Sequence, residues 1–237
     1  PCHINVLAGK RSQLVYWVDY VTLRRKGRMT DEQRVRRKQL EKCFRADPKG
    51  IERSFRRLYA MVCHLVCDGS RRNVVLATDK HPAYLRAERR HMSLKALLRQ
   101  KRILHERVSS KRVRNWGNPL FAVNYLDRQF RKDLAEHVRE TVCFGRNVNS
   151  SLDRLMIYLV YHNLRKPFRE AKGDLRSHAE VAGLSRQEVT SLCYGMFTRR
   201  AIYSQVLPKG RYCKMWLRDY QTPLKKKPEY KPLHVAA

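Results

Sequence analysis

Carboxylates within apolar segments are the residues of this sequence best suited to chemistry. The chain carries 52 Lys and Arg against 21 Asp and Glu, so an acid in an apolar run is conspicuous. Asp79 is the sharpest case, because it directly follows the apolar residues 74–78. Ligands of open α/β sheets gather at the carboxyl ends of strands, and carboxylates suit hard cations such as Mg²⁺. The placement predicts Asp79 as a metal ligand; the alternative is that it caps the helix expected around His81.

Asp127 is the second candidate acid, within a helix that we expect over 121–138. Four apolar residues form one stripe of that helix: Leu126, Phe130, Leu134 and Val138. At about 100° per residue they sweep an arc of roughly 120° that includes Asp127. A carboxylate on a core-facing side must be paired, neutral or bound to metal. Metal ligation and an ion pair with Arg131 or Arg128 therefore stay open as alternatives.

Asp19 is the third candidate, in the second strand of an expected hairpin and on the opposite face from Val18 and Tyr20. The alternative for Asp19 is a hydrated residue on a half-exposed strand. Glu140, shortly after the 121–138 helix, is a fallback acid. Cleavage of phosphodiesters by the two-metal route needs two to four converging carboxylates. Together these acids predict a site for two Mg²⁺ or Mn²⁺ ions.

Net charge points to the partner. The excess of basic residues gives a formal charge of 52 − 21 = +31, so a polyanion is the expected ligand. A hydrophobic share of 43% is enough for a folded core, which argues against a disordered basic tail protein. No apolar run approaches the roughly 18 residues that would span a bilayer. We expect a soluble, intracellular protein without a membrane partner, and the start at Pro1 rather than Met suggests a missing N-terminal portion.

The elements that must position these acids alternate between strands and helices. Hydrophobic periodicity predicts a β-hairpin at 3–22, helices at 30–46, 51–67, 81–100, 121–138 and 149–163, and strands at 73–79 and 102–108. Strands alternating with helices indicate an α/β layer architecture. The residue pattern changes near residue 170, where one compact helical segment at 177–197 precedes a Lys- and Pro-rich tail at 223–232. We therefore expect a domain at 1–170 and a helical, basic extension at 171–237.

Several segments resemble bacterial insertion-sequence transposases of the DDE type. The segments are NPLFAVNYLDRQFRKD (118–133), RETVCFGRNVN (139–149), LVYHNLRKP (159–167) and TDKHPAY (78–84), the last being similar to the second catalytic motif. The resemblance covers roughly residues 72–170. It implies an RNase H-like mixed sheet flanked by helices.

The same resemblance implies a reaction, in which water or a DNA 3′-hydroxyl attacks a phosphodiester in line at a pair of Mg²⁺ or Mn²⁺ ions. It implies element ends and target DNA as partners, a homo-oligomer on DNA, and a bacterial, nucleoid-associated location in the cytoplasm. The alternative is a catalytically inactive, decayed transposase or another basic nucleic-acid-binding protein.

Carried over by position, Asp79 is the second acid of the triad and Asp127 the third, with Asn124 one turn earlier as another position for it. The first acid is expected near residues 7–9, where this sequence has no carboxylate. Asp19 on the adjacent strand is one substitute. Alternatively, the acid lies in a missing N-terminal portion, or the chain is an inactive copy.

Three groups of residues are candidates for DNA contact. They are Arg128, Arg131 and Lys132 beside Asp127; Arg186, Gln187 and Thr190 in a segment (179–192) with helix-turn-helix spacing; and Lys225, Lys226 and Lys227 in the tail. A packing hairpin without DNA contact explains the 179–192 pattern equally. Aromatic residues near the proposed site could hold a splayed strand, although core packing is the alternative: Tyr16, Trp17, Trp116 and Tyr125.

Overall fold

The computed structural model describes residues 2–24, 26–69, 73–138 and 148–198, and has a mixed α/β fold. The chain divides into two compact units, residues 1–130 and 131–237. The sequence predicts the boundary after residue 170 instead. Within the second unit, helix α6 (Val148–Leu164) contacts strand β6 (Asp174–Ser177) and helix α7 (His178–Val181), so segments on both sides of residue 170 pack together.

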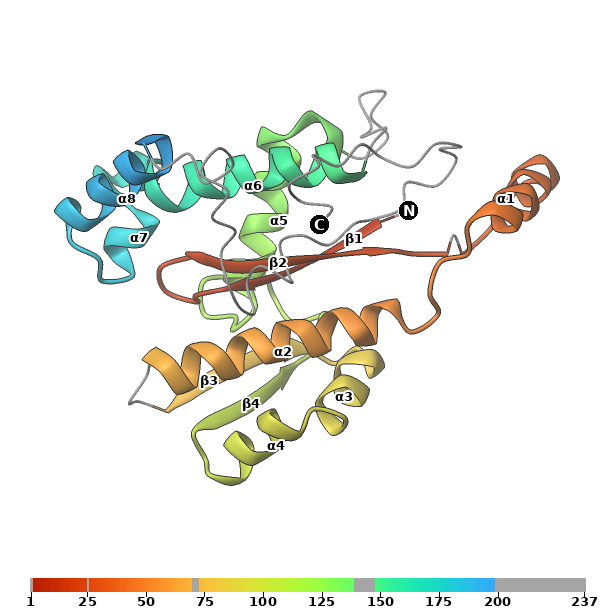
Figure 1. Ribbon diagram of the computed structural model, residues 1–237, viewed down its shortest axis with the longest axis horizontal. Coiled ribbons are helices and arrows are strands. Elements are labelled where there is room, and N and C mark those ends of the chain that lie inside the picture. Colours follow the sequence, from red (N-terminus) through yellow and green to blue (C-terminus); the bar gives the residue numbers. More distant parts are fainter. Residues whose placement is uncertain (1, 25, 70–72, 139–147, 199–237) are drawn as a thin grey trace. The chain divides into compact units, whose positions relative to one another are not determined.

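The first unit follows the expected order of elements. In chain order these are β1 (Cys2–Ala8), β2 (Val15–Thr22), α1 (Asp31–Cys43), α2 (Gly50–Gly69), β3 (Val74–Asp79), α3 (Pro82–Arg89), α4 (Met92–Arg99), β4 (Ile103–Val108) and α5 (Phe121–Asp133), whose end from Arg131 belongs to the second unit (Figure 1). β1 and β2 pair antiparallel, whereas β3 and β4 pair parallel, from Val74 opposite Ile103 to Asp79 opposite Val108. In the described residues these are two separate two-stranded sheets, whereas the resemblance implies a mixed sheet.

The core of the first unit forms where α2 packs on the strands. One stripe of α2 packs against β3, β4 and α4, and its buried members include Tyr59, Val62, Cys63 and Val66. Leu76 of β3 and Ile103 of β4 close this cluster from the other side. α2 also contacts β1 and β2, so one helix joins both strand pairs.

Histidine caps divide the segment that the sequence predicts as one helix at 81–100. The Nδ1 atom of His81 accepts from the N–H of Ala83 at the start of α3, and Nδ1 of His91 accepts from the N–H of Leu94 at the start of α4. Both histidines have extended backbone, typical of an N-cap residue. The prediction of one continuous helix is wrong, because the apolar periodicity continues across the break.

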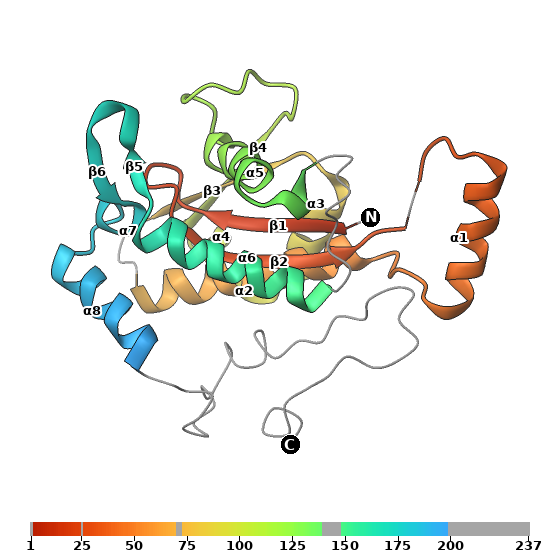
Figure 2. The ribbon, with the colours of Figure 1, turned by 90° about the horizontal axis from the view of Figure 1, so that it is seen from above.

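Helix α1 is polar on every side and buries no residue. A capping box starts it: Thr30 accepts from the N–H of Gln33, and the Gln33 side chain accepts from the N–H of Thr30. Arg24 donates two hydrogen bonds to Glu41, which ties the helix to the chain after β2. Figure 2 shows α1 projecting to one side of the first unit.

The second unit contains α6, a short hairpin of β5 (Pro167–Arg169) and β6, then α7 and α8 (Arg186–Thr198). The predicted helix at 149–163 is confirmed as α6, whereas the β5–β6 hairpin was not predicted. His162 of α6 and His178 of α7 are fully buried and stack with ring centroids 3.9 Å apart. No helix within the described part of the chain has the length and hydropathy needed to cross a membrane.

Replacement of Leu94 by Ala tests the core. Leu94 is fully buried in the cluster, while Met92, on the same helix, is 75% exposed. We expect Leu94→Ala to lower the free energy of unfolding by about 3 kcal/mol, since a core cavity adds to the lost burial. Met92→Ala should change it by less than about 0.5 kcal/mol. Urea unfolding followed by circular dichroism measures both, and equal effects would contradict a core that includes Leu94 and leaves Met92 outside.

Asp133 gives the second unit a dependence on pH. Burial raises the pKa of Asp133, but hydrogen bonds from Lys166 and Tyr158, each 2.6 Å long, outweigh it and hold the pKa below its ordinary value. A lowered pKa stabilises the fold above the unfolded value of about 3.9, and this stabilisation disappears as the pH falls through the folded value. We expect Asp133→Asn to unfold more easily than the unmodified chain at pH 6, with the difference smaller at pH 2.5. Asp153→Asn, at an exposed position on α6, is the control and should differ at neither pH.

Candidate functional site

Asp79 is the last residue of β3 and lies at the carboxyl end of the parallel β3–β4 pair. Its side chain is half-buried, and Oδ1 accepts from the N–H of His81 at 2.8 Å. Asp79 therefore fixes the turn into α3, while His81 is the residue that caps the helix. The carboxylate forms no ion pair within the described residues, so its charge is available at the strand end.

A hydrogen-bonded chain of three side chains lies behind Asp79. The Oγ1 atom of Thr78 is 2.8 Å from Nε2 of His105, and Nδ1 of His105 is 2.5 Å from a carboxylate oxygen of Glu88. The Thr78 hydroxyl also contacts the backbone oxygen of Asp79 at 3.1 Å. These residues come from β3, β4 and α3, so the hydrogen bonds between them connect the end of β3 to both β4 and α3.

Tyr84 completes the surroundings of Asp79. Its ring stacks on Phe55 of α2 with centroids 3.5 Å apart. Burial raises the pKa of Tyr84, and the nearby Asp79 carboxylate raises it further. The phenol therefore stays neutral at physiological pH, and its place beside Asp79 depends on packing.

Asp19 occupies a different environment from either of those predicted. Its side chain is fully buried, and both of its oxygens accept hydrogen bonds from Arg57 of α2, the shortest being 2.6 Å. The prediction of a hydrated residue on a half-exposed strand is wrong, because α2 covers this face of the hairpin. Next to this pair, Asn5 donates to Ser54 at 2.7 Å, which forms a buried polar layer between the hairpin and α2.

Asp127 is exposed, so the predicted core-facing position is wrong. α5 ends at Asp133, and its buried stripe consists of Ala122, Leu126 and Phe130. At about 100° per residue, Asp127 lies roughly 100° from the centre of that stripe. The predicted arc was too wide because it included Leu134 and Val138, which lie beyond the end of the helix.

The three predicted ligands do not assemble into one metal site. The described residues contain no group of three or more His, Cys, Asp or Glu side chains arranged to hold a metal ion. Asp79 and Asp127 have the exposure and the hard oxygen atoms that such a ligand needs, whereas Asp19 is neutralised by Arg57. Glu140 lies outside the described residues.

The predicted DNA-contact residues that the structure describes lie on α5 and α8. Arg128 and Lys132 are exposed on α5, and Arg131 is half-buried. The tail residues Lys225, Lys226 and Lys227 lie outside the described part of the chain.

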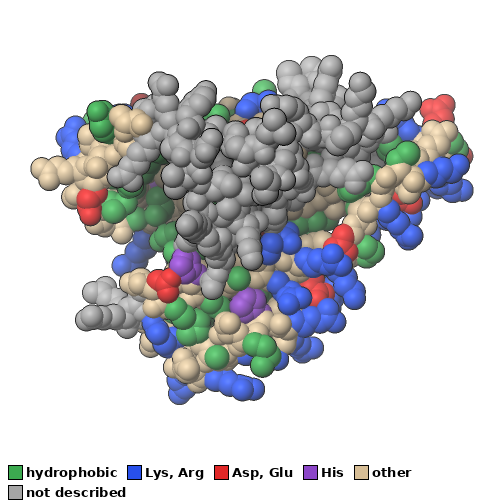
Figure 3. Space-filling view, viewed as in Figure 1, with side chains coloured by type: hydrophobic (Ala, Val, Ile, Leu, Met, Phe, Trp, Pro, Cys, Tyr) green, Lys and Arg blue, Asp and Glu red, His purple; other side chains and the backbone are tan. Residues whose placement is uncertain are grey.

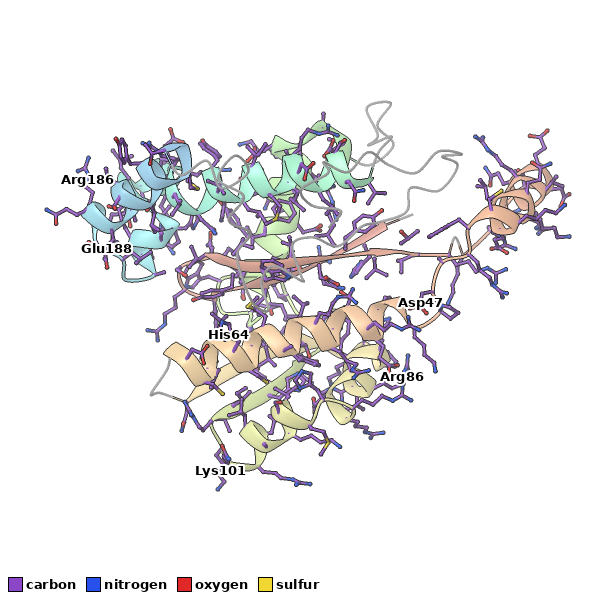
Figure 4. The ribbon with its side chains drawn as sticks, viewed as in Figure 1. Asp47, His64, Arg86, Lys101, Arg186 and Glu188 are labelled. Atoms are coloured by element: carbon purple, nitrogen blue, oxygen red, sulfur yellow. The ribbon has the colours of Figure 1, made fainter. Side chains whose placement is uncertain are left out.

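The segment at 179–192 forms two helices joined by a turn. Its first helix, α7, has only four residues, and the turn contains Gly183 with a φ of +115°, a conformation that favours glycine. Ser185 and Glu188 cap α8 reciprocally. Arg186, Gln187 and Thr190 are exposed on α8, and Arg186 points away from the helix (Figure 4).

A buried carboxylate on α2 was not predicted from the sequence. Glu52 is 4% exposed and accepts hydrogen bonds from Arg86 at 3.2 Å and Arg90 at 2.5 Å, both of which are half-exposed. On the face seen in Figure 3, Lys and Arg side chains gather over α1, the start of α2 and α3. An acid placed between Ile51 and Arg53 in an otherwise basic segment was the available signal.

Replacement of Arg57 tests the buried pair. Arg57→Met should lower the free energy of unfolding by about 3 kcal/mol, because it leaves the Asp19 carboxylate buried without its partner. The double variant Asp19→Leu/Arg57→Met should recover most of that loss, since no charge is then buried alone. Urea unfolding compares the two. A double variant less stable than the single one would show that the cost comes from packing rather than charge.

Comparisons of the chain with protein-family models, curated proteins and solved structures found no match in any of the three. The resemblance to DDE transposases therefore depends on the sequence motifs themselves.

Proposed function

We propose that the chain is a DNA transposase of the DDE type, which cleaves and joins DNA with Asp79 as an essential acid. The observation that carries the proposal is the position of Asp79 at the carboxyl end of β3, beside the parallel strand β4. The motif residues continue into α3, where Tyr84 lies near the carboxylate. An RNase H-like arrangement agrees with the order of elements, from an antiparallel hairpin through α2 to a parallel pair and α5.

Charge and exposure support DNA as the substrate. The net charge of +31 favours a polyanion, and exposed basic residues lie on α1, α2, α3 and α5. Asp79 and Asp127 are the residues proposed to hold a divalent cation. Such a cation, once bound, stabilises the negative charge that develops on phosphodiester oxygens. Asp19 does not fit this role, so the proposal leaves the first acid of the triad unassigned.

A nucleic-acid-binding protein without catalytic activity is the second candidate. The ion pair between Arg57 and Asp19 favours it, because Asp19 is the only carboxylate that the sequence offers on the hairpin. Both candidates bind DNA with an affinity that falls as salt rises. Only the transposase requires Asp79 for a covalent step.

Nicking of supercoiled plasmid in Mg²⁺ or Mn²⁺ separates the two candidates. We expect Asp79→Asn to reduce the nicking rate by at least roughly 100-fold, equivalent to about 2.7 kcal/mol of transition-state stabilisation. Asp127→Asn should have a similar effect, because both carboxylates are proposed to hold the same cation. Asp153→Asn, an exposed acid on α6, is the matched control and should retain full activity.

DNA affinity is measured in parallel by fluorescence anisotropy, so that lost binding is not taken for lost chemistry. Nicking that survives Asp79→Asn, or that is independent of divalent cations, contradicts the transposase proposal. Binding without nicking by the unmodified chain favours the second candidate.

A further inference from the structure

The segment between β4 and α5 combines basic and aromatic residues in a way that the proposed cleavage site does not use. Residues 107–126 contain no Asp or Glu. The segment's four cations are exposed: Arg107, Lys111, Arg112 and Arg114. Figure 2 shows the chain between β4 and α5 standing out from the first unit.

Three aromatic rings of this segment touch in succession. Trp116 meets Phe121 edge to face with ring centroids 5.0 Å apart, and Phe121 lies nearly parallel to Tyr125 at 6.2 Å. Trp116 is 47% exposed, and the other two rings are half-buried. A large ring held at the edge of such a row and half open to solvent presents part of its surface to another flat group.

The row continues along one face of α5. At about 100° per residue, Phe121, Tyr125 and Arg128 fall within an arc of roughly 60°, on a different side from the buried stripe. Arg128 is exposed and so adds a cation to the aromatic face.

Asn118 fixes the approach to this face. Its side-chain amide, 2% exposed, donates to the backbone oxygen of Val113 at 2.8 Å, and its carbonyl oxygen accepts from the N–H of Leu120 at 2.9 Å. These bonds join the two sides of the turn that carries Trp116. The tryptophan is therefore presented by a fixed turn rather than by an unconstrained loop.

We propose that Trp116, Phe121 and Tyr125, flanked by Arg114 and Arg128, form a binding surface for unpaired bases of single-stranded DNA. Aromatic rings stack on any base, and neighbouring cations contact the phosphates between the bases. Duplex DNA fits this surface less well, because its bases are stacked on one another and present no free face. The inference rests on the proposed function, since it assigns the form of DNA held beside the cleavage site.

Substitutions at Trp116 test the surface in the full 237-residue chain. The probes are fluorescein-labelled dT15 and a 15-base-pair duplex, with affinity measured by anisotropy. We expect Trp116→Ala to weaken dT15 binding by at least about fivefold, as expected for one stacked base, and duplex binding by less than twofold. Tyr161→Ala removes an aromatic ring that is 49% exposed on α6 and should alter neither affinity.

Two conservative variants separate stacking from packing. Trp116→Phe keeps a ring and should bind dT15 within about threefold of the unmodified chain, whereas Trp116→Leu keeps an apolar contact without a ring and should bind as weakly as Trp116→Ala. This comparison remains decisive if Trp116→Ala fails to fold. Arg128→Gln should reduce the slope of log affinity against log salt by about 0.7 on dT15, the value for one lost phosphate contact on a single strand.

Equal losses on dT15 and duplex, or equal binding by the Phe and Leu variants, overturn the inference. Neither result bears on the proposed function, because plasmid nicking and its dependence on Asp79 are measured separately. A chain that nicks DNA but fails these dT15 tests keeps the function and loses only this surface.

Discussion

The packing of α2 against two strand pairs is the constraint on which the first unit depends. β1–β2 and β3–β4 form separate sheets in the described residues, and Leu7 of β1 packs against the cluster that contains Leu76 and Ile103. α2 joins them through an apolar stripe on the β3–β4 side and a buried polar layer on the hairpin side. The position of Asp79 relative to the hairpin therefore depends on α2 together with the packing of Leu7.

That arrangement also explains how so basic a chain buries acids. Asp19 is matched by Arg57 and Glu52 by both Arg86 and Arg90, so each carboxylate buried against α2 has arginine partners from nearby elements. A buried pair of this kind adds little net stability compared with apolar packing, but leaving one partner alone is costly. The Asp19 pair joins β2 to α2, and the Glu52 pairs join α2 to α3 and to the residue that follows it.

Periodicity in the sequence was enough to predict most elements of the first unit and α6. It failed where the apolar pattern continues past the end of an element. His91 starts a new helix inside an unbroken apolar pattern, and α5 ends at Asp133 although apolar residues continue at the same spacing. Because the position of Asp127 was derived from those later residues, the error in the helix end became an error in the site. The burial of Asp19 could not be predicted from the sequence either, since it depends on contact with Arg57, 38 positions away.

Asp79 differs from Asp19, Glu52 and Glu88 in what it binds. Asp19 and Glu52 form ion pairs with arginines, and Glu88 is hydrogen-bonded to His105. Among the described residues, Asp79 has only a backbone N–H as its partner. The chain has 52 basic residues, yet the half-buried Asp79 forms no ion pair in the described part. Its position is fixed through Thr78, His105 and the turn to His81. A carboxylate held at a strand end in this way is what a cation-dependent site needs. Ion pairs that served only to stabilise the fold would not leave this carboxylate unpaired.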